Sequence, residues 1–409
     1  MLQIIVEKKS TLSVPNVGDA VGVEGDLVRS PHKNQPVELP AVEFEILGAF
    51  RDQEDFPFSP KLPVSPTVLR QHVYLRAKHS SFASLLRIRS CVKSLLNQYF
   101  QSRGYVQIDT PVITANDCEG AGDCFVIQSP KQATLSTEEE YFYFDRQAYL
   151  TVSGQLHLEA AASALPLVYT FGPAFRAERS LSRHHLAEFY MLEAEIAFMQ
   201  SLDELLDLVE DMVLSVSHGV LENCHDDVQQ CCSNYRPDND CLPLLQTLDK
   251  RHLKFVRITF AEAMELLKNA NASTSYVGHA FTKEQERFIC KHFDNTPVFV
   301  TNFPDDAKPF YMKRSPCQRW AFCFDLLCPG VGEICGGSVR DNQYESLERR
   351  ISHSSNKEQL KWYLDLRKFG HPPTSGFGLG FERFLQYLLG VRNIKDCLPF
   401  PRWYKHCPL

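Results

Sequence analysis

The sequence predicts an α+β fold, with an antiparallel sheet flanked by helices and a smaller β domain in front of it. Strand-like and helical patterns both occur, but they do not alternate as regular βαβ units, and no Gly-x-Gly-x-x-Gly opens a helix. Two apolar, strand-like runs flank a basic loop in residues 171–198, which predicts a long antiparallel hairpin. At 409 residues, the chain is long enough for two or three domains.

The N-terminal residues 1–55 are predicted to form the small β domain. Apolar residues alternate with polar ones in GDAVGVEGDLVRS and again in VELPAVEFEILGAF. Prolines recur from Pro57 to Pro66, which excludes a continuous helix there, so residues 56–78 are interpreted as a linker. The larger domain is then predicted over residues 79–409.

Helical periodicity begins near Ser80 and runs to Gly104, where a helix is expected to end. A strand is predicted in YVQIDTPVIT directly after it. Ser201, Thr259 and Thr282 each precede a Glu or Gln by three residues, the spacing of a capping box, which predicts three further helix starts. Residues 200–295 are expected to be a helical and loop-rich segment, with a polar, loop-rich stretch at 222–255.

The composition excludes several classes of protein. The 43 Lys and Arg residues against 50 Asp and Glu give a net charge of −7, so a nucleic-acid site would have to be a local basic surface. The 14 cysteines include no Cys-x-x-Cys pair, which gives a zinc site little support and favours free thiols in a reducing compartment. No apolar run reaches the ~18–20 residues that span a bilayer. Neither a secretory signal nor an Arg-rich presequence opens the chain.

The hairpin in residues 171–198 carries the first group of candidate site residues. Strand alternation places Arg176 and Glu178 on one face, and Phe189, Glu193 and Glu195 on one face of the returning strand. Cationic, anionic and aromatic side chains together suit a site that holds a phosphate, a base edge and a polar ligand. A surface hairpin with cross-strand ion pairs would show the same pattern.

The second group lies in GFGLGFERFLQYLLG, residues 376–390. Its glycines permit close approach to the backbone, and Arg383 falls in the first turn of the following helix, where an anion is favoured. A glycine-rich strand that packs tightly against its neighbour would have a similar sequence.

The third group lies in FDLLCPGVGEICGGSVR, residues 324–340. A turn at Pro329 and Gly330 would bring Asp325 and Glu333 together across two strands, and such oxygen ligands suit Mg²⁺ that also binds phosphates. A turn with solvated acids is the alternative, but the run is too apolar to leave an acid without a partner.

These segments together resemble the three signature motifs of class II aminoacyl-tRNA synthetases. The strand with Pro111 resembles motif 1, which implies a homodimer through that region; FRAE with the following HisHisLeu and GluPhe resembles motif 2; and GFGLGFER resembles motif 3. The resemblance implies the class II antiparallel sheet, preceded by a partial OB-fold anticodon-binding domain of the aspartyl, asparaginyl and lysyl subgroup. The class I signatures and the Walker P-loop are absent from the sequence.

The amino-acid pocket implied by the resemblance favours asparagine. Aspartyl enzymes carry a lysine where SGQLHLE has Leu158, so a cation for a carboxylate is missing here. Glu193 could accept from a carboxamide NH₂ and Arg340 could donate to its oxygen, whereas aspartate would meet Glu193 charge against charge. The SGQLHLE and PGVGEICGGSVR runs resemble asparaginyl-tRNA synthetases, most closely their mitochondrial forms.

The resemblance implies ATP-dependent ligation of L-asparagine to tRNA(Asn) through an asparaginyl-adenylate. It places Arg176 on the α-phosphate and the substrate carboxylate, Glu178 on the adenine amino group and Phe189 on one adenine face, with His185 and Arg383 on the β- and γ-phosphates. Arg176, Arg383 and Glu333 are the implied catalytic residues, and Asp325 and Glu333 the implied Mg²⁺ ligands. The implied asparagine-binding residues are Glu119, Gln155, Arg176, Glu193 and Arg340.

Three features depart from the family pattern. Cys118 replaces a serine, and His184 replaces an arginine, which removes a cation near pH 7. Residues 1–55 have room for only the later strands of a five-stranded OB barrel, so either the N-terminus lies upstream, with a mitochondrial presequence, or anticodon reading is degraded. The expected location is the mitochondrial matrix, otherwise the cytoplasm.

Three alternative functions remain open at this stage. The nearest is an aspartyl-tRNA synthetase. A catalytically weak, synthetase-like protein that binds RNA or dimerises is favoured by His184 and the short barrel, but not by the intact motif residues. An amide-forming paralogue that makes asparagine from aspartate should keep cationic contacts to aspartate, and Leu158 argues against it.

Overall fold

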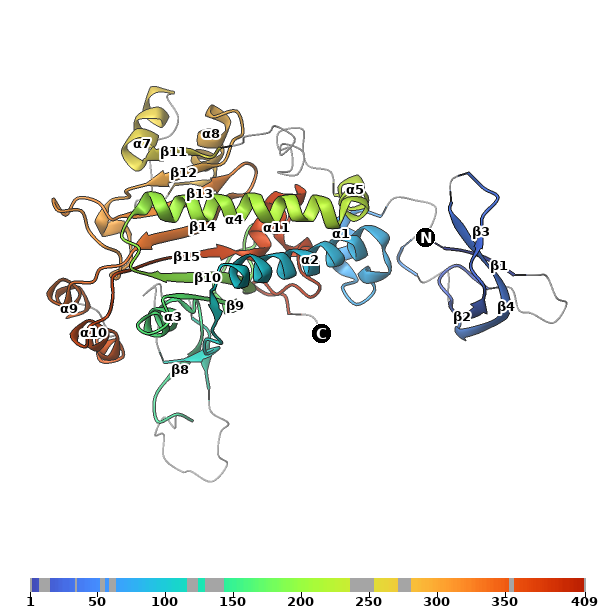
Figure 1. The fold of residues 1–409 in the computed structure, drawn as a ribbon, viewed down its shortest axis with the longest axis horizontal. Helices are drawn as coiled ribbons and strands as arrows, with labels where there is room; N and C mark the ends of the chain where they lie inside the picture. The colour runs from blue at the N-terminus through green and yellow to red at the C-terminus, as the bar shows by residue number, and fades with distance from the viewer. Residues whose placement is uncertain are drawn as a thin grey trace. The chain divides into compact units, whose positions relative to one another are not determined.

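The computed structural model describes residues 2–6, 15–33, 35–51, 56–58, 64–115, 124–128, 143–235, 254–270, 281–352 and 357–407. The chain divides into two units, Met1–Val64 and Ser65–Leu409 (Figure 1). This division falls inside the stretch that the prolines predict as a linker. From Ser65 onward the chain folds with the second unit, as α1 (Pro66–Gln71), which Ser65 caps, and the short helix η1 (Arg76–Lys78).

The first unit is a small, all-β sheet, as the alternating apolar pattern predicts. Strand β4 (Val37–Gly48) pairs with β1 (Gln3–Ile5) in parallel and with β2 (Ala20–Gly25) and β3 (Val28–Arg29) in antiparallel register. These strands fit a partial OB-like domain.

The second unit is built on an eight-stranded sheet of order β11-β12-β13-β14-β15-β10-β9-β5. The strands from β12 to β9 pair antiparallel, and the two edge pairs are parallel. The predicted antiparallel sheet flanked by helices is therefore confirmed. Its strands are β5 (Val106–Gln107), β9 (Leu167–Phe175), β10 (Glu188–Ala197), β11 (Val256–Thr259), β12 (Val298–Thr301), β13 (Cys323–Cys328), β14 (Gly332–Val339) and β15 (Thr374–Gly380).

One face of the sheet packs on helices α2 (Ser80–Ser102) and α4 (Leu202–Asn223), which run along it in Figure 1. Leu192 of β10, Leu379 of β15 and Val213 of α4 belong to the same buried apolar cluster. Helix α11 (Phe381–Leu389), which follows β15, adds an almost wholly buried surface to this core. The opposite face of the central strands is left for the site.

The sequence signals for helix ends are confirmed. Gly104 has φ +82° just after α2, as expected for a glycine that ends a helix. Ser201 caps α4, while Thr259 and Thr282 form full capping boxes at α7 (Phe260–Asn269) and α8 (Lys283–His292). The remaining elements are α3 (Gln155–Ala162), α5 (His225–Asn234), α9 (Tyr344–Ser352), α10 (Lys361–Lys368), η2 (Asp305–Ala307), η3 (Ile394–Asp396) and a small sheet of β6 (Ile113–Thr114), β7 (Val126–Ile127) and β8 (Ala148–Leu150).

Two local predictions were wrong. The described start of the stretch 222–255 is helical, because α5 buries Val228 and Cys231 in the main core despite its polar composition. The single strand predicted in residues 105–114 is two short strands in different sheets. Pro111 lies between them and has no N–H to donate to a ladder. Among the described residues, no helix has both the length and the apolar character needed to span a bilayer.

Candidate active site

The floor of the site is a glycine-lined stretch of the sheet. Gly378 of β15 lies between Glu193 of β10 and Gly336 of β14, and Gly376 lies between Glu195 and Ser338. Because glycine has no side chain, Gly378 offers backbone that a flat ligand can approach closely, whereas Gly376 lies beneath the side chains of Glu195 and Arg340. The room is limited, since a Cβ on Gly378 would lie 2.7 Å from the Met191 methyl group.

A pocket opens above this floor, and it contains every residue that the sequence assigned to ATP. Its wall residues are Arg176, Glu178, His184, His185, Leu186, Phe189, Met191, Glu333, Ile334, Cys335, Gly378, Gly380, Glu382, Arg383 and Ile394. One premise was wrong: β9 ends at Phe175, so Arg176 and Glu178 lie in the following loop and strand alternation does not apply to them. They line the pocket from this loop, which also carries the wall residues His184 and His185.

Two histidines in this loop line the pocket. The His185 Nδ1 atom hydrogen-bonds with the hydroxyls of Ser182 and, at 3.1 Å, Ser180, while its Nε2 lies 3.5 Å from Glu178 Oε2. Burial lowers the pKa of His185. His184 is buried, and burial together with the neighbouring cation Lys283 lowers its pKa to about 4, so it is neutral near pH 7.

Aromatic and cationic groups face each other across the pocket. The Arg176 guanidinium carbon lies 5.7 Å from the Phe189 ring centroid. The Phe189 ring packs against the small apolar cluster of Leu186, Ile394 and Leu398. Arg383 donates to the backbone oxygen of Glu333 at 2.9 Å, which ties the first turn of α11 to β14. The pocket therefore combines an aromatic surface with fixed cations, a combination suited to a nucleotide.

Asp325 and Glu333 converge over Gly336. A Cβ on Gly336 would lie 3.5 Å from Asp325 Oδ1 and 3.4 Å from Glu333 Oε1. Glu333 and Gly336 share this face of the sheet because strand β14 has a β-bulge: Leu327 pairs with Glu333, but Leu326 pairs with Cys335. The extra residue, Ile334, turns into the core, and Glu333 turns to the site face.

The carboxylate of Asp325 already has a cationic partner. Lys308 donates from Nζ to both carboxylate oxygens at 3.0 Å. Burial raises the pKa of Asp325 to about 6, while the nearby Lys308 opposes that shift. Sequence reasoning missed Lys308, because it lies in the irregular chain after η2 and matches no motif.

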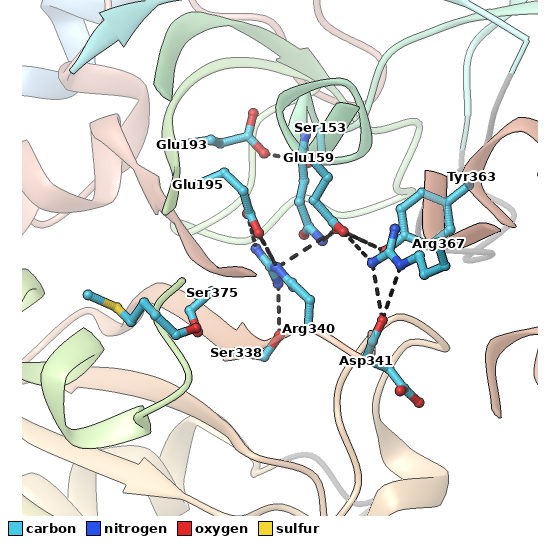
Figure 2. Close-up of polar contacts among 12 residues, drawn as sticks. Ser153, Glu159, Glu193, Glu195, Ser338, Arg340, Asp341, Tyr363, Arg367 and Ser375 are labelled. Atoms are coloured by element: carbon cyan, nitrogen blue, oxygen red, sulfur yellow. Dashed lines mark hydrogen bonds and ion pairs between the residues drawn. The ribbon is translucent and has the colours of Figure 1, made fainter. Parts of the chain in front are cut away.

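Three of the predicted amino-acid-binding residues, Gln155, Glu193 and Arg340, take part in polar contacts next to the pocket, and Figure 2 shows Glu193 and Arg340. Glu193 accepts from the Ser153 hydroxyl and, at 2.8 Å, from the Gly154 backbone N–H. Arg340 donates to Glu195 from Nε at 3.1 Å and from Nη2 at 2.9 Å. Gln155 donates to Glu159 at 3.3 Å.

Several residues of this network were missed by the sequence analysis or assigned no partner. Glu195 was placed only on the strand face, and it is the principal partner of Arg340. Glu159, Tyr363 and Arg367 carry no motif signal, because their contacts join segments about two hundred residues apart. Glu119 and Cys118 lie outside the described residues. In the described ranges, no group of three or more His, Cys, Asp or Glu side chains is arranged to hold a metal ion.

Comparison with known proteins gives a consistent family assignment. Residues 65–404 match the family described as tRNA synthetases class II (D, K and N). The asparaginyl-tRNA synthetase of Mus musculus is 42% identical over 416 residues, covering 100% of this chain and 85% of that protein. A probable mitochondrial asparagine–tRNA ligase of Dictyostelium discoideum is 40% identical, covering 99% and 87%. The structure resembles the asparaginyl-tRNA synthetase of Pyrococcus horikoshii solved with asparaginyl-adenylate, with a TM-score of 0.81, 30% identity and coverage of 95% and 84%.

Proposed function

The chain belongs to the class II tRNA synthetases of the D, K and N group, and we propose on that premise that it uses ATP to join L-asparagine to tRNA(Asn). The observation that carries the proposal is the position of the nucleotide-type pocket beside Glu193 and Arg340. The pocket and these residues share one glycine floor, which supports the proposal of a phosphate-binding region beside a carboxamide-binding region. The similarity to asparaginyl enzymes along the whole chain supports the same substrate.

The first step joins asparagine to AMP. An oxygen of the asparagine carboxylate attacks the α-phosphorus of ATP, the bond to the β-phosphate oxygen breaks, and pyrophosphate leaves. Arg176 holds the α-phosphate and the attacking carboxylate together and stabilises the charge that develops between them. Arg383 and His185 bind the leaving phosphates. Phe189 stacks on the adenine ring, and Glu178 accepts from its amino group.

The second step transfers the asparaginyl group. A ribose hydroxyl at the 3′ end of tRNA(Asn) attacks the carbonyl carbon, and AMP leaves with the electrons of the broken C–O bond. Both steps depend on positioning and charge stabilisation, so no side chain has to act as a nucleophile.

Asp325 and Glu333 fit a role as Mg²⁺ ligands. Mg²⁺ is commonly held by one or two carboxylates together with substrate phosphates, and these two carboxylates converge on the pocket side of Gly336. The ion would neutralise phosphate charge when bound. Lys308 forms an ion pair with Asp325, so the protein itself supplies one positive charge beside the proposed Mg²⁺ ligands.

The amino-acid region fits asparagine better than aspartate. Glu193 can accept from a carboxamide NH₂ and would repel a carboxylate. Leu158 is fully buried in an apolar cluster with Ala162 and Val168, so no cation comes from that position. Gln155 lies beside this region and is proposed to hold the α-amino end, with Glu119 as a second contact.

A homodimer through the motif 1 region is part of the proposal. Val106, Val112 and Ile113 expose 43%, 38% and 46% of their surfaces around Pro111, and the neighbouring Phe125 and Val126 are exposed as well. Apolar side chains gathered in this way are typical of a protein interface. We further propose that residues 1–55 contact the anticodon, and that the protein acts in mitochondria, as the Dictyostelium relative's name indicates for that protein.

The test is ATP–pyrophosphate exchange without tRNA, with asparagine and with aspartate as separate substrates. We expect exchange with asparagine, and its loss in Arg383→Gln. Arg392→Gln serves as a control arginine outside the pocket wall. Exchange with aspartate alone would identify an aspartyl enzyme. A folded, dimeric protein that exchanges with neither would favour the non-catalytic alternative.

A further inference from the structure

A buried ion network connects helix α3, strand β10, the end of β14 and helix α10 (Figure 2). Its charged members are Glu159, Glu195, Arg340 and Arg367, and all four side chains are at most 2% exposed. Charges this deep are costly to bury unless they neutralise one another. The two carboxylates and two guanidiniums do so, because their formal charges sum to zero.

The hydrogen bonds of Arg340 show how its guanidinium is held. Its Nε and Nη2 atoms donate to Glu195, and its Nη1 atom donates to the Ser338 hydroxyl at 2.8 Å. A guanidinium has five N–H groups, so one remains on each terminal nitrogen for a substrate. Arg340 is thus fixed in orientation but retains donors.

Glu159 is the second carboxylate near Arg340, at 3.9 Å from its Nε. It accepts from Arg367 Nη2 at 2.7 Å and from the Tyr363 hydroxyl at 2.8 Å. It also accepts from Gln155 at 3.3 Å. The Glu159 carboxylate therefore lies next to both Gln155 and Arg340, two of the residues proposed to bind asparagine. Arg367 in turn donates to the backbone oxygen of Asp341, the residue after Arg340.

We propose that Glu159 is a specificity-determining residue, which acts through the charge balance of Arg340 without touching the substrate. With Glu159 and Glu195 both present, Arg340 offers hydrogen-bond donors but little net positive charge. That suits the neutral oxygen of a carboxamide. An Arg340 with uncompensated charge would attract the carboxylate of aspartate. The inference rests on the proposed function, and it identifies Glu159 as a residue that makes the enzyme favour asparagine over aspartate.

A purely structural role for Glu159 makes a different prediction. If the network only stabilised the fold, replacing Glu159 would lower the activity with asparagine and with aspartate by the same factor, because both require the same folded site. The ratio of the two kcat/KM values does not depend on the fraction of folded protein. It therefore isolates the electrostatic role.

The experiment measures ATP–pyrophosphate exchange with each amino acid for the wild type, Glu159→Gln, Arg367→Gln and the double variant. Glu345→Gln, an exposed acid on α9, is the control for loss of one negative charge. In Glu159→Gln the ratio of aspartate to asparagine kcat/KM should rise at least about tenfold, mainly through a lower KM for aspartate. The double variant again has zero net network charge, so its ratio should return to within about threefold of the wild type.

The outcomes separate the two proposals. Wild-type exchange with asparagine, together with an unchanged ratio in Glu159→Gln, would overturn the role of Glu159 and leave the proposed function intact. A raised ratio that the double variant does not restore would also overturn the charge-balance argument, since the effect would then come from lost hydrogen bonds. Absence of wild-type exchange with asparagine would overturn the proposed function itself.

Discussion

Replacing Gly376 with alanine should destabilise the protein strongly, because Gly376 lies directly beneath the buried ion pair of Glu195 and Arg340. An added Cβ would lie 1.9 Å from Glu195 Oε2, 2.5 Å from the Ala194 backbone oxygen and 2.6 Å from Arg340 Nη2. Real Cβ contacts are never this short, so the strand or the ion pair has to move. Neither can move freely, since both are buried in the sheet.

The size of the effect follows from two terms. Overpacking a close-packed interior costs about 1–3 kcal/mol. Displacing one partner of a buried ion pair leaves an uncompensated charge, which costs about 3–5 kcal/mol when a partner is removed outright. Since partial relaxation is expected, we predict that the free energy of unfolding falls by at least about 3 kcal/mol.

Gly172→Ala is the matched control. Gly172 lies on strand β9, and apart from its own residue and its two chain neighbours no heavy atom lies within 4 Å of its added Cβ. Its alanine variant should change stability by no more than about 1 kcal/mol in either direction. All three tryptophans lie in the second unit, so their fluorescence during urea unfolding reports on the unit that contains both sites.

The comparison can refute the packing argument. If Gly376→Ala and Gly172→Ala unfold at the same urea concentration, the space beneath the ion pair is not needed. A stable Gly376→Ala protein that still discriminates asparagine from aspartate would also remove the link between this glycine and the orientation of Arg340.

Three further predictions concern other parts of the second unit. Arg89→Met should lower the free energy of unfolding by about 3–5 kcal/mol, because Arg89 pairs with the buried Glu382 at 2.8 Å. The control Arg87→Met, at a side chain that is 60% exposed, should lower it by at most about 1 kcal/mol. Equal urea midpoints for the two variants would contradict this prediction. His184 has a folded-state pKa of about 4, below its ordinary value of 6.5, so between these pH values the unfolded chain binds more protons than the folded protein. The free energy of unfolding should therefore fall by up to about 3 kcal/mol as the pH falls from 6.5 to 4. Urea unfolding at pH 6.5 and 4.5 should show a smaller loss of stability in His184→Gln than in the wild type, and an equal loss would refute the lowered pKa of His184. Ile113→Asp should raise the dimer dissociation constant at least about tenfold, because it puts a charge into an apolar interface. The dissociation constant is measured by sedimentation velocity, and a value equal to that of the wild type would show that Ile113 is not in the interface.

Local sequence patterns predicted much of the fold, because helix ends and strand pairing leave signals within a few residues. The side chains of Thr259 and Thr282 bond to backbone N–H groups three positions ahead, so their capping boxes are visible in the chain itself. The hairpin of β9 and β10 was predicted for the same reason, since its two apolar runs lie on either side of one loop. Those signals also located the loop that carries Arg176 and Glu178.

The tertiary structure alone decided which side chains meet in the site. An ideal two-residue turn at Pro329 and Gly330 would pair Leu326 with Glu333 and place Asp325 and Glu333 on opposite faces of the sheet. In the structure the loop is one residue longer, so Cys328 pairs with Gly332 and Leu327 with Glu333, which puts Glu333 on the face of Asp325. The bulge at Ile334 then brings Gly336 opposite Asp325, so that both carboxylates lie over this glycine, and no local sequence pattern announces it.

The charge partners of the site are equally non-local. Arg340 pairs with Glu195 across 145 positions of the chain, and Arg367 with Glu159 across 208. The sequence determined which cations and acids the protein has and which elements carry them. Their pairing was set by the sheet register and by the energetic requirement that charges removed from water be neutralised by whatever opposite charge the fold places beside them.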